Sequence, residues 1–132
     1  MTLSEHSQCV YGSVWSPHDP FRIASCSGDG TAKIWDVRHH GSAQTIMHGG
    51  EVLSLDFAKY TQNCIVTAGV DTTLKLWDLR NSSSPMQVLG GHEMAVRRVK
   101  FSPHNPDILA SVSYGKRSIY SRYDYARVEF IQ

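Results

Sequence analysis

Short apolar runs recur along the chain and are separated by polar or proline-containing segments. In one set of runs, apolar residues fall loosely at every second position; these runs are Val10–Trp15, Val52–Phe57 and Val96–Phe101. Each is followed by a second short apolar run, at 22–25, 64–67 and 108–111. A period of two is typical of β-strands, and no stretch sustains the period of a helix. The pattern predicts an all-β chain.

The same residue types return at a nearly constant spacing. The pairs Trp35-Asp36 and Trp77-Asp78 are 42 positions apart (77 − 35). His6, His48 and His92 are separated by 42 and then 44 positions, and so are Ser25, Thr67 and Ser111. Asp29 and Asp71 are separated by 42 positions. A period of about 40–45 residues that closes on Trp-Asp is typical of a WD repeat, which forms one four-stranded blade. The predicted fold is therefore all-β and consists of WD40 β-propeller blades.

About three such units are present, and the third departs from the pattern. The units span 1–42, 43–84 and 85–132. In the third unit Gly115 stands at the aspartate position, and Ser121 and Arg122 stand where Trp-Asp is expected. We therefore interpret this unit as degenerate or truncated. Propellers typically have about 4–8 blades, so three units predict an incomplete propeller with exposed blade faces.

Composition and charge exclude some classes of protein. The chain has 132 residues, 41% of them apolar, and no apolar run of the roughly 20 residues that a membrane helix needs. It shows no signal peptide, and its three cysteines form no CxxC pair, which favours the cytosol or nucleus. Residues 97–132 hold 7 Lys/Arg and 3 Asp/Glu, a net charge of +4 (7 − 3). A solvated face with a disordered tail explains this basic end more simply than nucleic-acid binding.

One group of polar residues has the composition of a catalytic triad. His6, Ser25 and Asp29 are of the right types, but the set recurs as His48, Thr67 and Asp71. A catalytic triad is not normally repeated once per structural unit, and no nucleophile elbow accompanies it. We expect a structural hydrogen-bond network that runs from tryptophan to hydroxyl to histidine to aspartate and satisfies buried polar groups. Its members are His6, Ser25, Asp29, Trp35, His48, Thr67, Asp71, Trp77, His92 and Ser111.

The remaining candidate chemistry is sparse. Seven histidines are present, but no HExxH and no cysteine–histidine cluster has the spacing of a zinc site. The glycine pairs lack the lysine and hydroxyl residue of a phosphate loop. We therefore expect no enzyme activity, no metal and no cofactor.

A binding surface is predicted where loops lead into the first strand of each unit. In WD propellers the residues three and five positions beyond the repeat histidine, and those just before the repeat aspartate, face one end of the blades. The resulting candidates for peptide binding are Tyr11, Glu51, Leu53, Val70, Arg97 and Tyr114. Aromatic and arginine side chains at the centre of a patch favour protein binding. The alternative is that these are ordinary loop side chains.

Some segments of the sequence are more specific than the general WD-repeat pattern. The segment 92–104 reads HEMAVRRVKFSPH, and 108–114 reads ILASVSY. With the phrases around Trp15 and Trp77, they make residues 4–114 resemble the peroxin-7 family of WD-repeat receptors for the type 2 peroxisomal targeting signal. The resemblance implies a non-enzymatic propeller that binds an N-terminal helical signal on cargo enzymes. It also implies a co-receptor peroxin, peroxisomal docking machinery, movement between cytosol and peroxisomal matrix, no nucleic acid and no direct membrane insertion.

The resemblance assigns roles to part of the candidate surface. Type 2 signals, as the resemblance implies, present basic and leucine-like residues on one helix face. Glu51 is then expected to meet a basic side chain, with Leu53 and Tyr11 as an apolar floor. The competing interpretation is a histone-binding WD-repeat protein, because such proteins share the phrases at 102–105 and 108–111.

Overall fold

The computed structural model describes residues 2–114 and the backbone of residues 124–130. This part of the chain contains strands and no helix, and every sheet is antiparallel. The first sheet has the order β1 (Val10–Trp15), β2 (Arg22–Ser27), β3 (Thr31–Asp36) and β4 (Ser42–Met47). The second has the order β5 (Val52–Phe57), β6 (Cys64–Gly69), β7 (Leu74–Asp78) and β8 (Gln87–Leu89). The predicted all-β architecture of propeller blades is confirmed.

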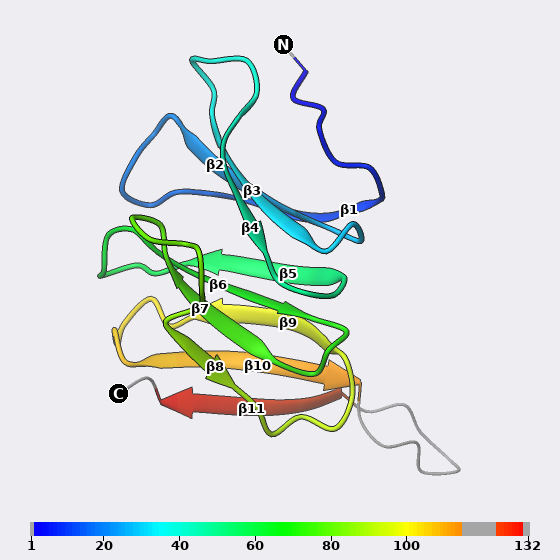
Figure 1. Cartoon of the computed structure of the whole chain (residues 1–132). Helices are drawn as coiled ribbons and strands as arrows, with labels where there is room; N and C mark the ends of the chain where they lie inside the picture. Colours follow the sequence, from blue (N-terminus) through cyan, green and yellow to red (C-terminus); the bar gives the residue numbers. More distant parts are fainter. Residues whose placement is uncertain (1, 115–123, 131–132) are drawn as a thin grey trace.

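A third sheet continues the stack. It has the order β11 (Asp124–Phe130), β10 (Ile108–Tyr114) and β9 (Val96–Phe101). The three sheets follow one another as successive layers, with β1, β5 and β9 side by side along one edge of the stack (Figure 1). These three strands are the alternating runs of the sequence, so the pattern located the strand at this edge of each sheet. It did not locate the strands at the opposite edge, β4 with six residues and β8 with three. The edge formed by β1, β5 and β9 is called the inner edge below.

Apolar side chains fill the two spaces between sheets. Between the first and second sheets lie Ala24, Cys26, Ile34, Ile46, Leu55 and Ile65, among others. Between the second and third lie Val66, Leu74, Leu76, Val96, Val99 and Leu109, among others. The second sheet therefore contributes to both cores, and all six residues of β6 are buried. Its sequence is apolar or small at every position but Thr67, which suits burial on two faces better than alternation does.

The third unit corrects two expectations. Residues 124–130 form β11, paired with β10, so a disordered tail is wrong for this segment. Leu109 pairs with Glu129, whereas Ile23 pairs with Trp35 in the first sheet and Ile65 with Trp77 in the second. Glu129 follows Ser121 by 8 positions (129 − 121), so the alignment of Ser121 with the tryptophans is also wrong. A constant period cannot detect a longer β10–β11 connection; Gly115, Ser121 and Arg122 themselves lie outside the described residues.

The sheets and the sequence units do not begin at the same residue. The sheets span 10–47, 52–89 and 96–130. The predicted unit 43–84 starts within β4, the outer strand of the first sheet, and ends before β8. The division into 1–42, 43–84 and 85–132 stays a sequence-level prediction that is offset from the sheets by about one strand. Within the described ranges, we find no helical segment of the length and apolar character that a membrane crossing requires.

Candidate functional site

The candidate surface lies at the end of the stack where β1, β5 and β9 begin. Tyr11 is the second residue of β1 and Leu53 the second of β5, while Glu51 directly precedes β5. Val70 follows β6 at the β6–β7 turn, on the same end of the second sheet. Tyr11 and Val70 are exposed, and Glu51 and Leu53 are half-buried. The repeat spacing therefore selected side chains that solvent reaches.

Tyr11 and Glu51 meet around Gly28. A Cβ atom at Gly28 would lie 3.2 Å from Glu51 Oε1 and 3.3 Å from Tyr11 Cε2. Gln8 Oε1 would be 3.2 Å away on the same side. These side chains occupy the space that a larger residue would need. The loop before β1, the β2–β3 turn and the segment before β5 thus converge on one polar and aromatic cluster.

The backbone of Glu51 is fixed by the second sheet. The amide of Val70 donates a hydrogen bond of 3.1 Å to the Glu51 carbonyl oxygen. A Cβ at Gly69 would lie only 2.0 Å from that same oxygen, so this close approach requires glycine. Glu51 and Val70 are consequently held next to each other. A half-buried glutamate whose backbone is held in this way suits recognition of a positively charged ligand.

Leu53 and Tyr11 share a small hollow on the inner edge of the stack. Its volume is ≈ 40 Å³, and Arg98 and Lys100 from β9 also line it. Sequence reasoning did not include these two cations among the candidates. Their signal was the alternation of β9 itself, which places Arg98 and Lys100 on one face of the strand. The hollow therefore has a side of apolar and serine residues from β1 and β5 and a basic side from β9.

Arg97 and Tyr114 form a pair of their own on the third sheet. The Arg97 guanidinium carbon lies 5.8 Å from the centroid of the Tyr114 ring. Guanidinium groups within about 6 Å of an aromatic face are attracted by the ring quadrupole. The six candidates therefore divide into a cluster of Tyr11, Glu51, Leu53 and Val70 and a separate pair of Arg97 and Tyr114.

The first sheet holds a continuous chain of polar bonds. Trp35 Nε1 donates to Ser25 Oγ at 2.8 Å, and this oxygen lies 2.7 Å from His6 Nε2. The other ring nitrogen of His6, Nδ1, lies 2.9 Å from Asp29 Oδ2. Asp29 also accepts from the hydroxyl of Thr31 at 2.6 Å. The network ties the segment before β1 to the β2–β3 hairpin.

The second sheet repeats this chain with the two ring nitrogens exchanged. Trp77 Nε1 donates to Thr67 Oγ1 at 2.8 Å, and this oxygen lies 2.7 Å from His48 Nδ1. His48 Nε2 lies 3.0 Å from Asp71 Oδ1. A neutral imidazole satisfies every partner: it accepts from the threonine hydroxyl and donates to the carboxylate. In the third sheet, His92 Nε2 lies 2.7 Å from Ser111 Oγ.

Electrostatics favour this arrangement of charges. Burial lowers the pKa of His48, although the Asp71 carboxylate opposes the shift. Burial works against ionised Asp71, but hydrogen bonds from His48 and Thr73 outweigh it and hold the pKa of Asp71 below its usual value. The pKa of Asp29 is likewise held well below its usual range, because bonds from Thr31 and His6 exceed the cost of burial. The folded state therefore stabilises neutral His48 and ionised aspartates.

The triad-like set is arranged as a scaffold. Ser25 is buried, and its oxygen is bonded to Trp35 on one side and to His6 on the other. A hydroxyl engaged on both sides and shielded from solvent is not positioned to attack a substrate. In the described part of the chain, no group of three or more His, Cys, Asp or Glu side chains is arranged to hold a metal ion.

Comparison with known proteins places this geometry among propellers. The family model described as the EIPR1 beta-propeller matches residues 2–117. The peroxisomal targeting signal 2 receptor of Saccharomyces cerevisiae is 35% identical over 85% of this chain and 36% of its own length. The receptors of that name from Homo sapiens and Mus musculus are each 48% identical over 77% of this chain. The chain spans about a third of the length of these relatives.

Proposed function

The chain belongs to the EIPR1 β-propeller family, and we propose that it forms part of a receptor that binds type 2 peroxisomal targeting signals on cargo proteins. The observation that carries the proposal is the similarity of the chain, over most of its residues, to receptors of that name in yeast and mammals. The buried, hydrogen-bonded polar networks support a binding scaffold without catalysis. No cofactor enters this function.

The cluster of Tyr11, Glu51, Leu53 and Val70 is the proposed contact surface for the signal. The convergence of Tyr11 and Glu51 around Gly28 gives an aromatic ring beside a carboxylate. Leu53 extends this surface into the hollow of the inner edge. An amphipathic helix with basic and leucine-like residues on one face fits such a surface by helix-in-groove recognition.

The apolar contacts supply most of the affinity in this proposal. An exposed ion pair contributes only about 0–1 kcal/mol, whereas buried apolar area contributes about 25 cal/mol per Å². Glu51 therefore selects the sign of the ligand's charge, and Tyr11 and Leu53 provide burial. Arg97 and Tyr114, on the next sheet, form a second zone that receives the far end of the helix or an accompanying protein.

The wider role follows from the same proposal. The receptor binds cargo in the cytosol, is joined by a co-receptor peroxin and is delivered to the peroxisomal docking machinery. It returns after release in the matrix, and it uses neither nucleic acid nor direct membrane insertion.

Peptide titration tests the proposal against the histone-binding alternative. A labelled type 2 signal peptide, a scrambled version of the same composition and a histone-tail peptide are titrated against the protein, with fluorescence anisotropy as the readout. We expect saturable binding of the signal peptide and at least tenfold weaker binding of the scrambled one. Preference for the histone tail would replace the receptor proposal with the chromatin one.

A further inference from the structure

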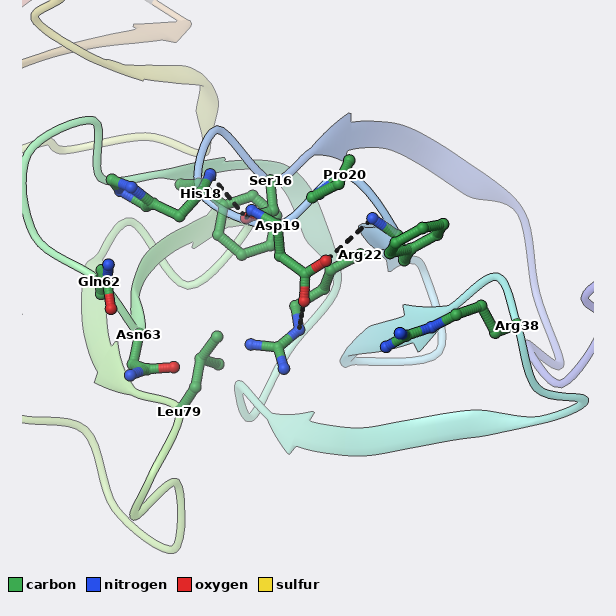
Figure 2. A pocket seen from close by; sticks show the side chains of 11 residues that line it. Ser16, His18, Asp19, Pro20, Arg22, Arg38, Gln62, Asn63 and Leu79 are labelled. Atoms are coloured by element: carbon green, nitrogen blue, oxygen red, sulfur yellow. Dashed lines mark hydrogen bonds and ion pairs between the residues drawn. The ribbon is translucent and has the colours of Figure 1, made fainter.

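A pocket lies at the end of the stack opposite the candidate surface, between the first and second sheets. Its volume is ≈ 390 Å³, and its lining comes from the loop after β1, from Arg38 and from the second sheet's Phe57, Asn63 and Leu79 (Figure 2). Pockets that bind small ligands begin at about 300 Å³. The space therefore accommodates a side chain of a partner, and none of its lining residues belongs to the proposed signal-binding surface.

The pocket is preformed by one bond between the two sheets and one within the second sheet. His18 Nε2 lies 3.0 Å from the carbonyl oxygen of Ala58, which links the loop after β1 to the end of β5. The Leu79 amide donates to the Asn63 carbonyl oxygen at 2.8 Å, which fixes the wall on the second sheet. Walls held in this way lose little conformational freedom on binding, so a ligand meets a smaller entropic cost.

Arg22 directs charge into this space. Its Nε lies 3.8 Å from Asp19 Oδ2, while Asp19 Oδ1 accepts a 2.9 Å hydrogen bond from the Phe21 amide. Figure 2 shows the guanidinium between Asp19 and Leu79, with its terminal nitrogens on the side away from Asp19. The ion pair thus orients Arg22 through Nε and leaves the terminal fork facing the pocket. Such a fork matches the two oxygens of a carboxylate.

Arg38 forms a wall rather than a second binding charge. Its Nε and Nη2 donate to the two oxygens of Asp36 at 2.9 and 2.6 Å. Its guanidinium carbon lies 4.5 Å from the centroid of the Phe21 ring. With Asp36 opposite it, most of its charge is compensated, and the stacked pair presents an aromatic surface beside Arg22.

The charges of the pocket are balanced, so a ligand binds through the Arg22 fork and not through net charge. Arg22 and Arg38 line it, and their partners Asp19 and Asp36 bring the sum to zero (2 − 2). A phosphate dianion would meet the Asp19 carboxylate at close range, and like charges repel there. A single carboxylate brings half that charge and has the two oxygens that the Arg22 fork can bind.

We propose that this pocket binds the side-chain carboxylate of an acidic segment of a partner protein. Arg22 forms the ion pair, and Phe21 and Leu79 pack against the methylene groups of the ligand's side chain. The inference is independent of the proposed receptor function, because it concerns the opposite end of the sheets.

Isothermal titration of the 132-residue chain tests this assignment. The probes are an acetylated, amidated peptide of sequence Gly-Glu-Glu-Leu-Gly, its glutamine counterpart and inorganic phosphate. We expect the glutamate peptide to bind at least about tenfold more tightly than the glutamine peptide, since charged hydrogen bonds are the stronger ones. Equal binding of the two peptides, or tighter binding of phosphate, would overturn the carboxylate assignment.

Charge variants locate the interaction. Arg22→Gln should weaken binding of the glutamate peptide about tenfold or more, and Arg22→Glu should bind the corresponding lysine peptide instead. Arg80→Gln is the control. It removes the same charge from an arginine that also pairs with an aspartate, Asp78, but does not line the pocket. Wild-type affinity in Arg22→Gln contradicts the proposal.

Amide shifts in NMR spectra of the wild-type chain give an answer that does not depend on how a variant folds. The glutamate peptide should shift Phe21 and Leu79 and leave Tyr11 and Glu51 in place. Shifts confined to Tyr11 and Glu51 would assign the peptide to the other end of the molecule and contradict the proposal.

Discussion

Equivalent faces of the first and second sheets have the same sequence pattern, but the face of the first sheet is partly open to solvent and that of the second is buried. In the first sheet, Trp15, Ile23 and Trp35 are cross-strand partners; 42 positions later, Phe57, Ile65 and Trp77 hold the same places. Trp15 is 57% exposed, whereas Phe57 is 3% exposed. The second sheet packs this face against the first sheet. Burial at equivalent repeat positions thus depends on the neighbouring sheet and not on the residue type.

Trp35 shows how the first sheet buries part of this face without a neighbouring sheet. It lies on the same face as Trp15 but is only 3% exposed. The ring of His6 packs edge-on against it, with centroids 6.2 Å apart, and His6 belongs to the segment before β1. A polar network and a short segment protect one tryptophan, while the other stays in water.

Truncating the two equivalent aromatic residues should give the largest difference in stability between the two faces. Phe57→Ala should reduce the free energy of unfolding by about 3–5 kcal/mol, because it opens a cavity between two sheets. Trp15→Ala should cost about 1 kcal/mol or less, since much of this side chain is already in solvent. Urea denaturation of both variants gives the difference. Equal losses would show that both faces are covered in solution.

The polar networks offer a second comparison. Asp71→Ala should cost roughly 1–3 kcal/mol, because His48 loses its acceptor at a buried position. Asp29→Ala should have a similar effect on the first sheet. Asp107→Ala, in an exposed loop, is the control and should stay within about 0.5 kcal/mol of the wild type. If Asp71→Ala instead removes ligand binding at unchanged stability, Asp71 is a surface contact.

Acid should weaken the second sheet through His48. Because burial lowers the pKa of His48 in the folded state, its stabilising contribution is complete above the unfolded value of about 6.5 and declines as pH falls below it. The low pKa values of Asp29 and Asp71 add a further loss only below about pH 4. Urea midpoints between pH 8 and pH 5, compared with those of His48→Gln, measure the first step. A wild-type profile as flat as that of the variant would contradict it.

The exposed face should also promote self-association or instability of this chain. Apolar surface left in water costs about 25 cal/mol per Å², and Val10, at the opposite end of β1 from Trp15, is also exposed. Trp15→Lys should reduce association in sedimentation or size-exclusion experiments while changing stability little. A cooperative melt from a clean monomer of 14.8 kDa would argue against this expectation.

The sequence predicted the inner strands and the network residues because both are local patterns repeated at a fixed interval. It missed features that depend on neighbours or on loop length. Asp56 is fully buried, pairs with Lys59 at 2.9 Å and accepts the Phe101 amide at 2.8 Å, yet no equivalent aspartate occurs in the other units. The pocket around Arg22 arises from two loops on different sheets. Contacts across sheets leave no period in the sequence, so neither feature was predictable from spacing.

Charge substitution at Glu51 tests the proposed receptor surface most directly. Titrations of a type 2 signal peptide with the full-length receptor should show that Glu51→Ala weakens binding modestly, by about 0–1 kcal/mol. Glu51→Lys should weaken it further, because repulsion of the ligand's basic residue is added to the loss of attraction. Binding of both variants with wild-type affinity would contradict the account and place the signal on another part of the propeller.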